Sequence, residues 1–236
     1  GGGGGGAAPS EHILSLDGIR LAFAGKVLLR PTSLHVSRGG RYGLVGQNGV
    51  GKTTLLNRLA AGDINGFPAG LRCLYVQHEV LVNARQPLGA FMRSEVPGAS
   101  DEEVGNALDA VGFDEGMRRG TVAELSGGWR MRLALARSML QRADLLMLDE
   151  PTNHLDVGAV AWLAEYLRSV DTTVLVVSHD YDFLGKVATH IIHFEGQQLS
   201  CYDGGFSGFR EARPEVTLPH MKIVERREGA EAAAGE

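Results

Sequence analysis

Gly46-Gln47-Asn48-Gly49-Val50-Gly51-Lys52-Thr53 follows the pattern G-x-x-x-x-G-K-T. The stretch Arg41-Tyr42-Gly43-Leu44-Val45 before it predicts a buried strand, and Thr53–Ala61 after it predicts a helix. In such a loop the glycines let backbone N–H groups surround phosphate oxygens, and the helix adds the positive end of its dipole. Gly46–Thr53 therefore predicts a phosphate-binding loop, which we call the phosphate loop.

Single residues of the phosphate loop have separate expected roles. Lys52 supplies a mobile positive charge, and the Thr53 hydroxyl is placed to ligate Mg²⁺. An ordinary glycine-rich turn is the competing interpretation, and the Lys-Thr pair in register counts against it. The expected nucleotide contacts are Gly46, Asn48, Gly49, Gly51, Lys52, Thr53 and Thr54.

An apolar run, Leu145–Leu148, ends in two carboxylates, Asp149 and Glu150. At the tip of a buried strand, Asp149 can hold the Mg²⁺ shell. Glu150 can act as the base that polarises the attacking water, a role typically worth about 10²–10⁴-fold in rate. Acids after an apolar strand are common, so this pattern is weak alone. Together with Lys52 and Thr53 it predicts the second half of a nucleotide–Mg²⁺ site.

Two further side chains are candidates for nucleotide contact. His179 follows the predicted strand Val174–Val177, which we expect beside Leu145–Leu148, so its imidazole should reach the γ-phosphate. A structural histidine is the competing interpretation. Phe23 lies in an alternating stretch, Ile19–Leu29, that predicts strands, and its ring could stack on adenine or belong to the core.

Leu125-Ser126-Gly127-Gly128-Trp129 precedes a predicted helix, Arg130–Leu140. A serine and two glycines at a helix start offer N–H groups, a hydroxyl and a positive dipole to an anion. An ordinary serine-capped helix is the alternative. Because the chain already has one phosphate loop, we expect Ser126, Gly127 and Gly128 to cap the nucleotide of a second, facing domain.

Length and composition agree with one large α/β domain. The chain has 236 residues and a net charge of −5, which gives no broad signal for nucleic acid. Apolar strand patterns alternate with helical patterns, which predicts a layered α/β core. No apolar run approaches the roughly 20 residues of a membrane-spanning helix. Two cysteines, Cys73 and Cys201, are too few for a disulfide framework, which favours a reducing compartment.

In this order the motifs resemble the nucleotide-binding domain of the ABC superfamily, over about residues 11 to 210. Asn153-His154-Leu155-Asp156, Trp129 and the ending Tyr202–Phe209 look like the soluble ABC-F branch rather than transporters. The longest matching run, Leu125–Arg137, is similar to the first cassette of translation elongation factor three. Shorter runs with the same likeness are Leu21–Leu29, Gly39–Leu44 and Gly66-Phe67-Pro68.

The resemblance implies an ABC ATPase domain with a mostly parallel P-loop core sheet, an antiparallel β subdomain and a small helical lobe. It implies ATP and Mg²⁺, and a second cassette, in the same polypeptide or in a homodimer, that full hydrolysis requires. It also implies action on the ribosome in translation elongation, in the cytoplasm and without a membrane. The ATPase subunit of a transporter is the alternative function, and a non-catalytic regulatory domain is a third.

The resemblance also divides the chain. We expect a Gly-rich linker at 1–10, the cassette at 11–212 with its helical lobe at about 85–140, and a polar tail or connector at 213–236. Six glycines rather than a methionine open the chain, so we expect it to be processed or cut from something longer. Direct RNA contact stays open, because Arg118-Arg119 and Arg226-Arg227 are equally typical of a solvated surface.

One metal contact is ambiguous in the sequence. The family has a Mg²⁺-sensing glutamine where the strand predicted at Leu71–Val76 meets the helical lobe. Gln77 comes one place early, and His78 occupies the matching position. Gln77 is our candidate for this contact, with His78 as the alternative.

Overall fold

A six-stranded sheet forms the centre of the computed structural model, which describes residues 12–77 and 86–219. The strand order is β4-β5-β6-β3-β7-β8, and β8 (Gln198–Asp203) runs antiparallel to its neighbour. The other five strands are parallel, which confirms the predicted core sheet. They are β3 (Arg41–Gly46), β4 (Cys73–Gln77), β5 (Leu145–Asp149), β6 (Thr173–Val177) and β7 (His190–Glu195).

The central strands are apolar along their whole length because both faces of the sheet are buried. Leu145 and Met147 of β5 face one core, and Leu146 and Leu148 face the other. Successive side chains of a strand point to opposite faces, so a strand covered on both sides has no polar positions to alternate with. This packing explains the continuous apolar runs of the sequence.

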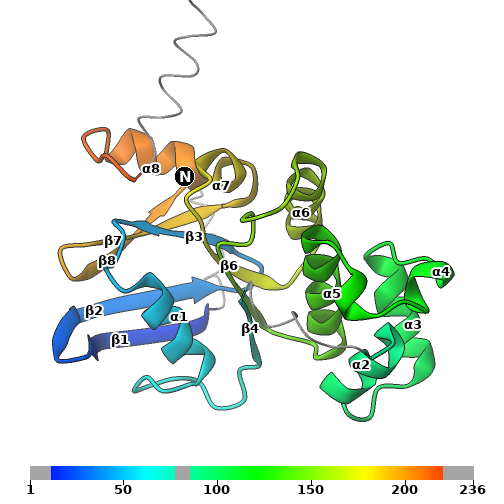
Figure 1. Ribbon diagram of the computed structural model, residues 1–236. Coiled ribbons are helices and arrows are strands. Elements are labelled where there is room, and N and C mark those ends of the chain that lie inside the picture. The colour runs from blue at the N-terminus through cyan, green and yellow to red at the C-terminus, as the bar shows by residue number, and fades with distance from the viewer. Residues whose placement is uncertain (1–11, 78–85, 220–236) are drawn as a thin grey trace, which may run out of the picture.

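An antiparallel hairpin covers one face of the sheet together with α1 (Lys52–Ala60) (Figure 1). The hairpin consists of β1 (His12–Phe23) and β2 (Lys26–Ser37). A turn at Ala24 and Gly25 divides the alternating stretch that predicted strands; both residues have positive φ, 47° and 78°. The hairpin confirms the predicted antiparallel β subdomain and places Phe23 at its tip.

Helices cover the other face of the sheet and extend to one side of it (Figure 1). Four of them form a group that we call the helical lobe: α2 (Leu88–Glu95), α3 (Asp101–Ala110), α4 (Glu115–Arg118) and α5 (Gly127–Leu140), with the 3-10 turn Val122–Glu124 before α5. The others are α6 (Val157–Ser169), α7 (Tyr181–Val187) and α8 (Gly205–Ala212). Ser100 caps α3 by a capping box with Glu103, in which each side chain accepts a hydrogen bond from the backbone N–H of the other residue.

Residues 213–219 pack against the domain, although their polar composition shows no core pattern. Val216 and Leu218 are buried, and Gln47 Nε2 of the phosphate loop donates to the Thr217 carbonyl at 3.0 Å. The Tyr181 hydroxyl and Arg210 Nη1 also donate to backbone carbonyls of this segment, so it is held by two apolar side chains and by side-chain hydrogen bonds. The expected linker at 1–10, His78 and Arg226-Arg227 lie outside the described residues.

Among residues 12–77 and 86–219, we find no helix with the length and apolar character needed to cross a membrane.

Candidate functional site

The phosphate loop joins β3 to α1, and Lys52 points back into it. Lys52 Nζ donates to the carbonyls of Gly46 at 2.9 Å and Gln47 at 3.1 Å. Gly51 has φ +114°, a conformation that favours glycine, and an added Cβ would lie 2.9 Å from Leu28. Burial lowers the pKa of Lys52, while Glu150 and Asp149 raise it. The Lys52 nitrogen therefore lies inside the loop, where phosphate oxygens could replace the two carbonyls as its hydrogen-bond partners.

The Thr53 hydroxyl and the Asp149 carboxylate lie together where β5 ends beside the start of α1. Thr53 Oγ1 donates to Asp149 Oδ2 at 2.8 Å, and the Tyr75 hydroxyl donates to the same oxygen at 2.9 Å. A hydroxyl and a carboxylate are ligands that Mg²⁺ prefers, and it commonly completes its shell with water and phosphate oxygens. The residues present therefore fit Mg²⁺. Sequence analysis missed Tyr75, because its partner Asp149 comes from another strand, far away in the chain.

Glu150 and His179 lie next to each other at the ends of β5 and β6. His179 Nε2 is 3.4 Å from Glu150 Oε1, and the His179 backbone N–H donates to Oε2 at 3.3 Å. Glu150 has φ +49°, and its own N–H donates to the carbonyl of Val177 at 2.8 Å. Burial raises the pKa of Glu150; the His179 hydrogen bond opposes this, and Asp149 adds to it. A carboxylate held in this way can accept a proton from water.

A cavity of about 770 Å³ brings the separate predictions together. Phe23 lines it with an exposed ring, 64% accessible, which excludes a core role. Gly46 is absent from the lining; it packs against Phe194, whose carbonyl oxygen would lie 2.5 Å from a Cβ at this position. The predicted residues that line the cavity are Phe23, Asn48, Gly49, Gly51, Lys52, Thr53, Thr54, Asp149, Glu150 and His179.

Sequence analysis missed five further lining residues. Lys26 and Asn153 are the polar ones, and Ala24, Leu28 and Val177 are the apolar ones. A basic residue three places beyond a predicted stacking aromatic was an available signal for Lys26. Gln77 ends β4 opposite Asp149 in the strand register, so its backbone lies beside the candidate Mg²⁺ ligand.

The Ser126–Gly128 turn lies outside this cavity, at the start of α5. Ser126 is the N-cap residue, but its exposed side chain makes no capping hydrogen bond. The side-chain hydrogen bond that an ordinary serine cap makes is therefore missing at the start of α5. The cavity and the Ser126–Gly128 turn are separate features of one chain, as expected if the turn serves the nucleotide of another domain.

The sequence model of the family described as ABC transporter matches residues 29–66 and 68–153, more than half of the chain. The chain belongs to this ABC family. The ABC chain is also similar in fold to a nucleotide-free ATP-binding cassette from an ABC transporter, with a TM-score of 0.72 at 17% identity over 89% of this chain and 98% of that one. The predicted fold class is confirmed.

Curated relatives match most of the ABC chain. It is 48% identical over 202 residues to NU+ prion formation protein 1 of Saccharomyces cerevisiae. This alignment covers 83% of this chain and 17% of the relative. It is 45% identical over 202 residues to elongation factor 3 of Phytophthora infestans, covering 83% of this chain and 20% of the relative. The chain thus spans about a fifth of the length of the curated relatives it matches.

Proposed function

We propose that this ABC cassette binds ATP with Mg²⁺ and hydrolyses it, as part of a protein that acts on the ribosome in translation elongation. The observation that supports hydrolysis most strongly is the Glu150 carboxylate, fixed beside His179 in the same cavity as Lys52. A cassette that only binds nucleotide has no need of an oriented base at this position.

The residues of the cavity divide the work of binding. Phe23 stacks on the adenine, and backbone N–H groups of the phosphate loop and the Lys52 ammonium hold the phosphates. Thr53 and Asp149 hold Mg²⁺, with Tyr75 orienting the Asp149 carboxylate and Gln77 as a further candidate contact. When bound, Mg²⁺ neutralises charge on the transferred phosphoryl group.

The chemistry that this chain supplies is proton transfer and positioning. Glu150 orients the attacking water and takes its proton, and the raised pKa makes the carboxylate a better base. His179 holds the γ-phosphate and keeps the carboxylate in place through its backbone N–H. Lys52, Glu150 and His179 are our proposed catalytic residues.

Full hydrolysis in this proposal needs a second cassette, in the same polypeptide or in a homodimer. The Ser126–Gly128 turn closes the site of the partner cassette, and the turn of the partner closes the cavity described here. ATP favours the closed pair because it contacts both halves only there. In the proposed division of the chain the cassette spans 11–212, with the helical lobe at about 85–140 and connectors on both sides.

The cellular role is proposed from the relatives. Similarity to elongation factor 3 supports translation elongation, ribosome contact and a cytoplasmic site. Transport is disfavoured by the sequence Asn153-His154-Leu155-Asp156, which looks like the soluble branch of the superfamily.

A phosphate-release assay on the protein that contains this chain, with and without ribosomes, tests the proposal. We expect ATP hydrolysis that ribosomes stimulate, and its loss in the matched Glu150→Gln variant. We also expect the Glu150→Gln protein to co-sediment with ribosomes only when ATP is present. Hydrolysis that ribosomes leave unchanged, without ATP-dependent co-sedimentation, would overturn the translational role.

A further inference from the structure

Arg132 lies between two indole rings that belong to different helices. Its Cζ is 3.7 Å from the ring centroid of Trp162 on α6 and 4.8 Å from that of Trp129 on α5. Its Nη1 also donates to the carbonyl of Val111, the C-cap residue of α3, at 2.7 Å. Aromatic faces attract a guanidinium through the ring quadrupole. One side chain therefore joins α3 and α5 of the helical lobe to α6 outside it.

Aromatic contacts extend this stack in both directions. Trp129 packs on Phe113, a fully buried ring, with centroids 4.9 Å apart. Trp162 stacks on Tyr166, one turn along α6, with centroids 5.2 Å apart. A row of rings with a guanidinium in it therefore runs from the interior of the lobe to the partly buried Tyr166 on α6. Movement of α5 along α6 would break this row.

The Ser126–Gly128 turn rests on the segment that leads from Glu150 into α6. A Cβ on Gly127 would lie 3.1 Å from the His154 carbonyl oxygen, and a Cβ on Gly128 would lie 2.9 Å from Ala159 Cβ. The two glycines are thus needed for close approach to this segment. Because α5 begins at the turn and carries Arg132 just over one helical turn later, the stack and the turn move as one unit.

We propose that Arg132 is a positioning residue. Its contacts with the rings of Trp129 and Trp162 hold the Ser126–Gly128 turn in place against α6. The inference rests on the proposed function, in which this turn contacts the ATP of a second cassette. Arg132 lies outside the cavity lining, so it does not touch the nucleotide of its own chain. Its effect is on the turn, and through the turn on closure of the pair.

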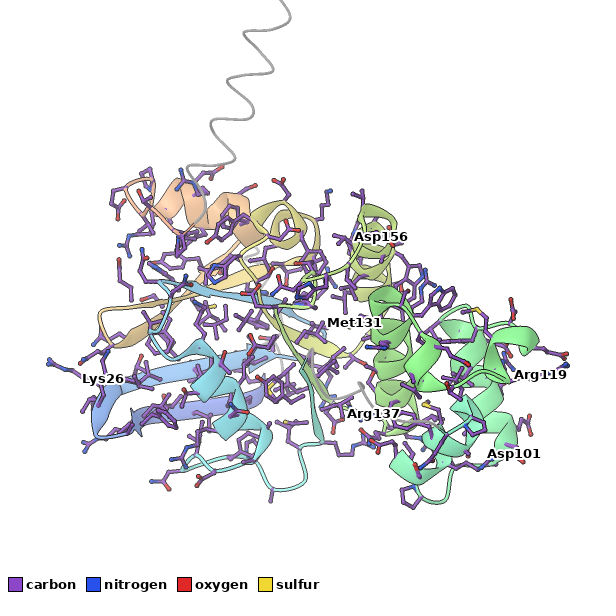
Figure 2. The ribbon with its side chains drawn as sticks, in the orientation of Figure 1. Lys26, Asp101, Arg119, Met131, Arg137 and Asp156 are labelled. Carbon is purple, nitrogen blue, oxygen red and sulfur yellow. The ribbon has the colours of Figure 1, made fainter. Side chains whose placement is uncertain are left out.

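Hydrogen exchange at the start of α5 tests this placement without any need for activity. In Arg132→Met the amide of Arg130, which donates to the Ser126 carbonyl at 2.9 Å, and the amides of the next turn of α5 should exchange about tenfold faster, because the guanidinium no longer ties α5 to α6. Arg132→Lys keeps the charge and should restore part of the protection. Arg119→Met is the matched control; its side chain is 82% exposed, at the outer edge of the lobe and well apart from Asp156 at the start of α6 (Figure 2).

Tryptophan fluorescence reports on the same stack. The chain has two tryptophans, and both flank Arg132, so the emission belongs to the stack alone. Emission should shift to the red in Arg132→Met and stay unchanged in Arg119→Met. If Arg132→Met does not fold, Trp162→Leu removes one side of the grip and should accelerate exchange in the same amides.

ATP assays then separate positioning from general damage. Binding of a fluorescent ATP analogue to the chain should stay within about twofold of wild type, while hydrolysis by the paired assembly falls about tenfold to a hundredfold. Unchanged exchange at the start of α5, or unchanged hydrolysis despite faster exchange, would overturn the inference. If the wild-type assembly does not hydrolyse ATP, the proposed function is refuted instead. The exchange rates would still decide whether Arg132 holds the turn in place.

Discussion

His179 Nε2 lies 3.4 Å from Glu150 Oε1, and its backbone N–H donates to Oε2 at 3.3 Å. The two residues end neighbouring parallel strands, so the sheet itself fixes the distance between them. Both oxygens of the carboxylate thus face one residue, beside a loop that holds a buried ammonium. This arrangement sets the direction in which Glu150 can accept a proton.

Glu150→Gln should reduce hydrolysis by about 10²–10⁴-fold, because an amide has nearly the same shape but cannot accept the proton of the attacking water. ATP affinity should stay near wild type, since Lys52 and the phosphate loop are unchanged. Phosphate release and titration with a fluorescent ATP analogue measure the two effects. Steady-state hydrolysis at the wild-type rate would contradict the role of Glu150.

Tyr75→Phe should raise the Mg²⁺ concentration needed for ATP binding, by about tenfold or more. The variant removes the hydroxyl that donates to Asp149 Oδ2, so the carboxylate loses an orienting partner. Titration of Mg²⁺ at fixed ATP analogue measures the change, and binding without Mg²⁺ is the control that should not respond. An unaltered Mg²⁺ midpoint would show that Thr53 alone keeps Asp149 in place.

The sequence predicts those parts of the site in which residues adjacent in the chain act together. The phosphate loop and the Asp149-Glu150 pair are of this kind. Contacts between distant elements leave no such pattern, so the hydroxyl of Tyr75 on Asp149 and the grip of two tryptophans on Arg132 appear only in the structure. Val216 and Leu218 were missed for another reason: two apolar residues are too few to show a period.

The place of a residue in the fold also decides its role, even where its type is noticed in the sequence. Phe23 fits a core strand by its alternation, and the Ala24-Gly25 turn is what brings the ring to the cavity. The glycines of the Ser126–Gly128 turn fit an anion site by composition. The structure adds that both are required for packing on His154 and Ala159.

His193 should make the domain less stable in acid. It is buried beside Phe209, and burial lowers its pKa below the ordinary 6.5; Glu195 opposes this shift, Arg213 adds to it and Glu215 opposes it. Below that pH the unfolded chain binds a proton that the folded chain does not. The free energy of unfolding should therefore decrease as the pH is lowered, by up to about 1.4 kcal/mol per pH unit.

Urea unfolding at neutral pH and below pH 6 measures this loss in wild type and in His193→Gln. Glutamine is polar but does not titrate, so the variant should lose less of its stability on acidification. An equal loss in both proteins would assign the acid sensitivity to other groups.

Ser126→Arg should leave ATP binding by the isolated chain intact, because the turn is outside the cavity lining. The same change should abolish hydrolysis by the paired assembly, since a bulky cation would replace the hydroxyl that we propose faces the nucleotide of the partner. Titration of the chain and phosphate release by the assembly provide the two readouts. Lost binding in the isolated chain would mean that the turn belongs to the cassette's own site.

A structure of the Glu150→Gln assembly with ATP measures the central claim most directly, through the distance from Ser126 Oγ to the nearest γ-phosphate oxygen. The account predicts a hydrogen bond of about 3 Å to ATP held by the opposite phosphate loop. Ser126 in open solvent, with ATP enclosed by one cassette alone, would contradict it.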